Sequence, residues 1–453
     1  MKLNQVKGNQ LDFVRKGAIY QIFPDRFARD ESALTELDPE TRADVLAGRE
    51  LVAWDAEPTP QNFFGGNLRG VTSRLDYLSH LQVGNIYFNP IFDAPSNHRY
   101  DTRNYFEIEP LIGNGADLRT LTAAASRLGI GVVLDGVFNH SGREMPEFLA
   151  AKAGDPAWRD FFTIYPDDSY QTFGGTEFMP KLNTANPAVV DYFASVIRHW
   201  HDYGIAGWRL DVPYKFAEGF MHQLREKTRD LSSAQYFVGE AWNEWSFATD
   251  FEAVQNYRTG NRILDFVHKH AADSEDMILD IIRWCKTWGD FSVLPHFIDS
   301  HDTQRFATAV EGRRDSWELG FALHMLLPGV PVLYYGTELA LQGVNDPGCR
   351  ATYPTRLSTE QRSALEFSTP WVQLRGTSKA LSHGGLEVHE LKNYAILFER
   401  RFDNESIEVL VNAGYNDELM LANIAGEWID QNQQRVQLGN NVPRRSLFYR
   451  LAN

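Results

Sequence analysis

Short apolar runs alternate with helix-length segments along most of the chain. Runs of strand length occupy residues 17–23, 83–88, 131–134, 203–210, 236–239, 251–254, 293–298 and 331–335. Between them, apolar residues recur every three or four positions, as in Leu118, Leu121, Ala125 and Leu128, which predicts amphipathic helices. Strands that alternate with helices form parallel sheets, and eight of them suit a closed barrel. We therefore predict an α/β fold built on a (β/α)8 TIM barrel.

Two segments break this pattern. Residues 139–183 are rich in Gly, Pro, Asp and aromatic side chains and are too long for an ordinary connection, which predicts a small subdomain inserted at the barrel rim. Regular order resumes at Asn186, a suitable helix N-cap that is followed by Pro187. From about residue 379, apolar positions alternate as in antiparallel strands. The predicted parts are barrel at 1–138 and 184–378, subdomain at 139–183, and a C-terminal β-sandwich domain at 379–453.

Acidic residues stand at the ends of three predicted strands. Asp211 follows the run 203–210, Glu240 follows the run 236–239, and Asp302 lies shortly after the run 293–298. We expect these strands to be successive, so that the three acids meet at the carboxyl rim, where barrel enzymes collect their catalytic groups. Arg209 shares a strand face with Asp211 and is expected to lower the pKa of that carboxyl, which makes Asp211 a candidate nucleophile or charge stabiliser. Taken alone, such a pair is more often a structural salt bridge.

Charge and composition narrow the classes of partner. The chain has 453 residues and a net charge of −16 without a basic patch, which argues against nucleic acid and anionic membranes as partners. Aromatic residues make up 13% of the chain and suit stacking on the flat faces of sugars. Cys285 and Cys349 belong to no metal-binding or disulfide pattern. Because no signal-like leader or apolar run of about 20 residues is present, a cytoplasmic location is expected.

Several motifs resemble the α-amylase family of glycoside hydrolases over nearly the whole chain. Its four conserved regions are matched, in order, by residues 135–140, 207–211, 239–242 and 297–302. Residues 179–183, Met-Pro-Lys-Leu-Asn, resemble a fifth region in the form typical of the neopullulanase, cyclomaltodextrinase and maltogenic amylase branch. Residues 22–27, 89–92 and 96–101 resemble the same branch.

This resemblance implies a division of roles among the three acids. Asp211 is the expected nucleophile, Glu240 the general acid/base, and Asp302 the carboxylate that stabilises the transition state. A retaining glycosidase needs one ionised carboxylate and a second, protonated carboxyl about 5–5.5 Å away. The implied substrate contacts come from Tyr100, which stacks on the sugar, from His140 and His301, which bind its hydroxyls, from Asp346 and Arg350, which grip the neighbouring sugar, and from Arg209, Trp242 and Lys215. Asp135 and Asn139 are expected to be structural.

The chain also departs from that branch. After Asp211 the branch usually reads Val-Ala-Asn-Glu, whereas residues 212–215 are Val-Pro-Tyr-Lys, so the acceptor side of the site is open to question. The extra N-terminal β domain that commonly builds a domain-swapped dimer in the branch is not seen in the sequence. We therefore expect a more open site, and either a monomer or a homodimer.

Three functions are consistent with these residues. The first is hydrolysis of α-1,4-glucosidic bonds in maltooligosaccharides, cyclodextrins and related α-glucans, in preference to raw starch. The second is transglycosylation of the 4-α-glucanotransferase type, and the third is a catalytically silent carbohydrate-binding homologue. No cofactor is expected; calcium, which many members of the family bind, is possible but is not expected to be required, and no metal ligand is assigned.

Overall fold

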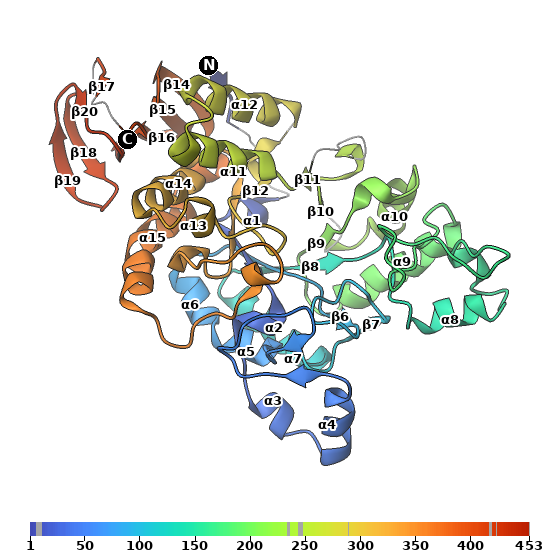
Figure 1. Ribbon diagram of the computed structural model, residues 1–453. Helices are drawn as coiled ribbons and strands as arrows, with labels where there is room; N and C mark the ends of the chain where they lie inside the picture. The colour runs from blue at the N-terminus through green and yellow to red at the C-terminus, as the bar shows by residue number, and fades with distance from the viewer. Residues whose placement is uncertain are drawn as a thin grey trace.

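The centre of the molecule is an eight-stranded parallel sheet in the order β11-β10-β9-β8-β5-β2-β13-β12 (Figure 1). The computed structural model describes residues 1–5, 11–232, 236–242, 248–288, 290–415, 419–422 and 424–452. The strands are β2 (Ile19–Ile22), β5 (Asn85–Phe88), β8 (Gly131–Gly136), β9 (Gly207–Leu210), β10 (Phe237–Gly239), β11 (Ala253–Val254), β12 (Pro295–Phe297) and β13 (Val330–Tyr334). The sheet closes on itself where Asn256, just after β11, pairs in parallel with His296 of β12. The predicted TIM barrel is confirmed.

Each of the eight predicted runs overlaps one of these strands. The run 203–210 becomes strand only from Gly207, because Gly204 takes a positive φ of 78° in the turn that ends the preceding helix.

The prediction that the three acids follow successive strands was wrong. β11 stands between β10 and β12 in the sheet closure, so Asp302 follows the second strand after Glu240.

The predicted helices also form. α7 (Gly115–Arg127) is capped by Asn114, whose side chain accepts from the N–H groups of Ala116 and Asp117. α9 (Pro187–His201) begins after Asn186, which accepts from the N–H of Ala188. The remaining helices are α1 (Asp12–Arg15), α2 (Pro24–Phe27), α3 (Ser32–Thr35), α4 (Pro39–Leu46), α5 (Leu68–Ser73), α6 (Leu75–His80), α8 (Pro146–Lys152), α10 (Phe220–Thr228), α11 (Tyr257–Leu264), α12 (Ser274–Thr287), α13 (Phe306–Ala309), α14 (Arg314–Leu326), α15 (Thr359–Thr377) and α16 (Lys379–His383).

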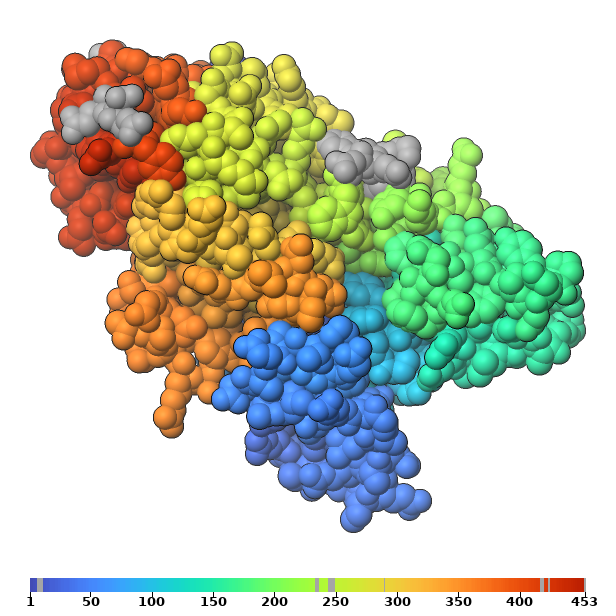
Figure 2. All heavy atoms as spheres, in the orientation of Figure 1, coloured from blue at the N-terminus to red at the C-terminus, as the bar shows by residue number. Residues whose placement is uncertain are grey.

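Two excursions from the barrel project as lobes in Figure 2, one at the right and one at the bottom. The first is the insertion after β8, which carries α8 and is held together by isolated bridges such as Phe162 with Leu182 and Thr172 with Pro180. The second contains α3 and α4, in the segment between β2 and β5. A short hairpin of β6 (Phe92–Asp93) and β7 (Asn104–Ile108) adds to the rim.

The C-terminal part is an antiparallel sheet that also takes in the start of the chain. Its order is β1-β14-β15-β16-β21-β18-β19, and a separate pair, β17 with β20, lies beside it. The strands are β1 (Lys2–Leu3), β14 (Gly385–Lys392), β15 (Ala395–Phe402), β16 (Glu405–Asn412), β17 (Leu419–Met420), β18 (Gly426–Asp430), β19 (Arg435–Leu438), β20 (Asn441–Val442) and β21 (Ser446–Ala452). The segment 1–138 therefore contributes strands to both sheets.

Side chains alternate across this sheet as the period of a strand requires. Ile396 and Phe398 of β15 join the large apolar core that runs through the barrel and its helices, while Leu397 between them joins a smaller core with Val442 of β20. One face of the sheet is thus fixed to the barrel. No helix within the described parts of the chain has the length and apolar character needed to cross a bilayer.

Candidate active site

The three acids meet in one cavity of about 350 Å³ at the carboxyl end of the barrel strands. Asp211 directly follows β9, Glu240 directly follows β10, and Asp302 lies in the loop after β12. The cavity is lined by His98, Tyr100, His140, Phe173, Met179, Asp211, Val212, Tyr214, Glu240, Trp242, Asp302, Asp346 and Arg350. Strand order therefore brings together carboxyls that lie up to 91 positions apart in the sequence.

A single buried guanidinium connects the carboxyls beneath the cavity. Nη1 of Arg209 lies 2.8 Å from Oδ1 of Asp135 and 3.0 Å from Oδ1 of Asp211, and its Nη2 lies 3.0 Å from Oε2 of Glu240. Asp135 accepts two further hydrogen bonds, from the hydroxyls of Tyr87 and Tyr100. Arg209 is only 1% exposed and does not line the cavity, so its action on a substrate has to pass through these carboxylates.

Arg209 lowers the pKa of Asp211, as expected, but the net shift of that pKa is upward. Burial raises the pKa of Asp211 well above its usual value, the neighbouring Glu240 raises it further, and the attraction of Arg209 offsets only part of this rise. Burial is the largest cause of the rise, and the charge of Arg209 is also shared with Asp135 and Glu240. Burial also raises the pKa of Asp302, although 32% of its side-chain surface is exposed, and Arg350 and Arg209 oppose the rise.

Glu240 is held at both oxygens. Its Oε2 accepts from the backbone N–H of Val212 at 3.0 Å as well as from Arg209, and its Oε1 accepts from the indole N–H of Trp242 at 2.7 Å. Val212 has a φ of 39°, a left-handed conformation that is strained for a β-branched residue. In this backbone conformation the N–H of Val212 points toward Glu240. Trp242 in turn stacks on Tyr257, with centroids 4.0 Å apart and planes 6° apart.

His301 is fixed in one tautomer. Its Nδ1 lies 2.9 Å from the amide nitrogen of Gln21, which can only donate, so Nε2 carries the proton. That Nε2 lies 2.7 Å from the hydroxyl of Tyr100 and 3.1 Å from Oδ2 of Asp302. Burial lowers the pKa of His301 well below its usual value. His301 is therefore neutral and orients Tyr100 and Asp302 toward the cavity.

His140 presents an unused donor to the cavity. Its ring stacks on Phe173 of the inserted segment with centroids 4.6 Å apart, and its Nδ1 lies 3.1 Å from the amide nitrogen of Asn139. The proton therefore sits on Nε2, a buried nitrogen for which the described residues supply no partner. Burial lowers the pKa of His140 to about 3, so the ring stays neutral. A neutral N–H of this kind suits a sugar hydroxyl.

Arg350 joins the far wall of the cavity. It lies 3.3 Å from Oδ1 of Asp302 and 3.0 Å from Oδ1 of Asp346, and its Nε donates to the carbonyl of His301 at 2.9 Å. Lys215 is exposed and is not a lining residue; its Nζ lies 5.4 Å from the ring centroid of Tyr214, which does line the cavity. Of the predicted substrate contacts, Arg209, His301 and Lys215 do not line the cavity.

The sequence did not single out several side chains of this site. His98 lies within the motif at 96–101, and Phe173 lies within the aromatic insertion, so motif context could have found both. The supports of the deeper layer, Tyr87, Gln21 and the backbone N–H of Val212, carry no sequence signal, because their roles depend on strand register and on one unusual φ angle.

Comparison with known proteins agrees with this geometry. The family model described as the alpha amylase catalytic domain matches residues 21–418. A cyclomaltodextrinase of a Bacillus species is 35% identical over 88% of this chain and 73% of its own, and neopullulanase 2 of Thermoactinomyces vulgaris is 33% identical over 88% and 70%. The cyclic α-maltosyl-(1→6)-maltose hydrolase of Arthrobacter globiformis, in complex with that saccharide, aligns over 98% of this chain and 99% of its own at 30% identity, with a TM-score of 0.84.

Proposed function

The chain belongs to the α-amylase family of glycoside hydrolases, and from this we propose that it cleaves α-1,4-glucosidic bonds of maltooligosaccharides, cyclodextrins and related α-glucans with retention of configuration. The observation that carries the proposal is the bridging of Asp211 and Glu240 by one guanidinium, with Asp302 in the same cavity. A carboxylate pair held this closely suits double displacement better than the wider pair of an inverting enzyme.

The proposed reaction assigns one role to each carboxyl. Asp211 attacks the anomeric carbon while Glu240 gives its proton to the departing glycosidic oxygen, which leaves a glycosyl ester on Asp211. Glu240 then takes a proton from water, and the resulting hydroxide displaces Asp211 and restores the α configuration. Oε2 of Glu240 is occupied by Arg209 and Val212, so Oε1, beside the partly exposed Trp242, is the oxygen that delivers the proton.

The remaining lining residues would bind the sugar that is under attack and its neighbour. The neutral donor at His140 Nε2 would serve a sugar hydroxyl, the ring of Tyr100 would stack on the sugar, and Asp302 and Arg350 contact each other across the wall of the cavity. As positive charge develops at the anomeric carbon, the ionised forms of Asp211 and Asp302 are favoured. The positive charge thereby counteracts the burial that raises the pKa of both carboxyls in the ligand-free site.

We expect maltohexaose and β-cyclodextrin to be cleaved to maltose and glucose with a higher kcat/KM than soluble starch. Phe173 and Met179 of the inserted segment narrow the cavity beside His140, which favours short or curved glucans. The measurement is product chromatography on maltotriose, maltohexaose, β-cyclodextrin, pullulan, starch and sucrose, with the anomer of the first product read by NMR. Preference for starch would contradict the ranking alone, whereas exclusive action on sucrose would contradict the substrate class.

Transglycosylation is the second candidate, because Tyr214 and the exposed Trp242 give the acceptor side two aromatic side chains on which a second sugar can stack. A sugar hydroxyl then replaces water in the second displacement. Oligomers longer than the substrate at high maltotriose concentration would identify this activity.

We propose that the activity does not depend on calcium. Asn139 offers one buried oxygen for which the described residues supply no partner, but calcium takes six to eight oxygens, several of them from carboxylates. No three His, Cys, Asp or Glu side chains gather as a metal site anywhere in the described residues, and Asp168 of the insertion already pairs with Lys152 at 2.8 Å. The residues therefore fit this ion poorly.

Chelation with EDTA is accordingly expected to change neither activity nor melting temperature. Activity on maltohexaose and a thermal unfolding curve, recorded before and after dialysis against EDTA, provide the measurement. A large loss of either that added calcium restores would overturn the proposal.

A further inference from the structure

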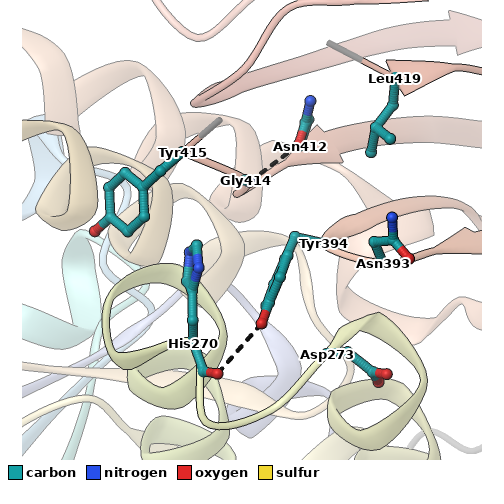
Figure 3. A pocket seen from close by; sticks show the side chains of 8 residues that line it. All are labelled: His270, Asp273, Asn393, Tyr394, Asn412, Gly414, Tyr415 and Leu419. Carbon is teal, nitrogen blue, oxygen red and sulfur yellow. Dashed lines mark hydrogen bonds between the residues drawn. The ribbon is translucent and has the colours of Figure 1, made fainter. Parts of the chain in front are cut away.

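A second hollow lies where the segment before α12 meets the C-terminal sheet (Figure 3). Its volume of about 300 Å³ is close to the 350 Å³ of the catalytic cavity, and the two share no lining residue. We propose that this hollow binds a glucose unit of an α-glucan outside the catalytic cavity, an inference that rests on the proposed function.

The frame of the hollow is held by hydrogen bonds between the barrel and the sheet. The N–H of Ser274 donates to the carbonyl of Asn393 at 2.8 Å, and Nε2 of His270 lies 3.1 Å from the carbonyl of Ala413. The hydroxyl of Tyr394 donates to the carbonyl of His270 at 3.3 Å. The walls are therefore fixed before any ligand arrives, which lowers the entropic cost of binding.

Aromatic rings form a column along one side. Tyr415 stacks on His270 with centroids 4.5 Å apart, and His270 stacks on Tyr394 at 4.1 Å. Tyr415 is also covered by the guanidinium groups of Arg313 and Arg445, so its surface is already used. Figure 3 shows Tyr394 at the other end of the column, between His270 and the side that Asn393 and Asp273 border. Its outer face is the one on which a pyranose ring can stack.

The polar groups beside that face match the hydroxyls of a neutral sugar. The side-chain amide of Asn393 is exposed and has no hydrogen-bond partner among the described residues. Asp273 uses Oδ1 to cap α12 at the N–H groups of Glu275 and Asp276, which leaves Oδ2 available. None of the lining residues is Lys or Arg, which disfavours an anion, and one carboxylate is too few for a divalent cation. An aromatic face with an amide and a carboxylate at its edge suits a polyhydroxylated ring.

The test uses the full chain with Asp211→Asn, which keeps the substrate intact, and titrates it calorimetrically with maltohexaose. We expect two binding events, and we expect Asn393→Gly in the same background to weaken one of them by at least about tenfold, since an amide that serves the ligand is lost. Glycine tolerates the φ of 51° at this position, so the turn is kept. Tyr394→Leu, which removes the stacking face, should weaken the same event.

The active enzyme with Asn393→Gly supplies the control. Its kcat/KM on maltotriose should equal that of the parent, because residue 393 lies outside the catalytic cavity. A single binding event in the parent, or two events that both variants leave unchanged, would overturn the inference while hydrolysis stands. Absence of any binding together with absence of hydrolysis would overturn the proposed function as well. Should Tyr394→Leu fail to fold, Asn393→Gly decides the outcome.

Discussion

Asp211→Asn and Glu240→Gln are each expected to abolish turnover of maltohexaose while leaving the fold intact. Loss of a general acid/base costs about 10²–10⁴-fold, and loss of the nucleophile should cost at least as much, because no other carboxyl can form the glycosyl ester. Each change replaces one oxygen by a nitrogen of nearly equal size, so the packing around Arg209 is preserved. Near-normal kcat in either variant would contradict the assigned roles.

Activated substrates separate the two roles. α-Maltosyl fluoride needs no proton on its leaving group, so Glu240→Gln should recover much of its first-step rate on this substrate and Asp211→Asn should not. Azide should rescue Asp211→Gly by entering the space of the lost carboxylate and attacking from the same side. The product, β-maltosyl azide, would have inverted configuration. An α-azide, or rescue of Glu240→Gln alone, would reverse the assignment.

The stability of Asp211→Asn provides a check on its fold. The pKa of Asp211 is raised in the folded protein, so the contribution of this group to stability is fully present below its usual pKa near 3.8 and is lost as pH rises through the raised value. An uncharged amide does not suffer this loss. Asp211→Asn should therefore melt at or above the parent temperature at neutral pH, and the advantage should vanish in acid.

Arg209→Met is expected to destabilise the protein strongly as well as to inactivate it. Asp135, Asp211 and Glu240 would lose the cation they share, and removal of one partner from a buried ion pair costs about 3–5 kcal/mol. Denaturant unfolding at neutral pH measures the loss, and kcat/KM on maltohexaose should fall more than about 100-fold. The unfolding midpoint should recover in part at lower pH, where the carboxyls accept protons.

Arg209→Lys is the matched control. A lysine restores the charge, but its single ammonium cannot place one nitrogen on Asp211 and another on Glu240 as the guanidinium does. Arg209→Lys should therefore regain more of the stability than of the activity. An Arg209→Met variant with the unfolding midpoint of the parent would show that the three carboxyls do not depend on this cation.

The barrel could be predicted from the sequence because its signals are local. Each strand is a short apolar run, and the N-cap residues Asn114 and Asn186 mark the start of α7 and α9. The pairing of β1 with β14 had no such signal, since β1 is only two residues long and its partner lies 385 positions away in the sequence. The break between α5 and α6 at Arg74 was equally hidden, because apolar positions continue in phase across it.

The site was predictable at the level of which residues meet, and much less so at the level of charge. Motif and strand-end position identified Asp211, Glu240 and Asp302, and the cavity contains all three. The pKa of Asp211 could not be read from its neighbour Arg209 in sequence, because burial raises that pKa and because Asp135, 74 positions upstream of Arg209, draws on the same guanidinium. Burial and competition for a counter-ion are properties of the assembled barrel.

The edge position of β1 bears on how the protein is made. Lys2 pairs with Glu387, 385 positions later, so β1 leaves the ribosome long before the strand with which it pairs. At about 5–20 residues per second, this wait lasts roughly 20–80 s during synthesis. Over that interval β1 lacks the strand with which it pairs, so a chaperone or another unpaired strand edge can compete for it. Deletion of residues 1–5 removes β1 and its pairing with β14, which should lower the yield of folded protein from cells. The same deletion removes the segment that stays unpaired during synthesis, so the loss of yield should be small.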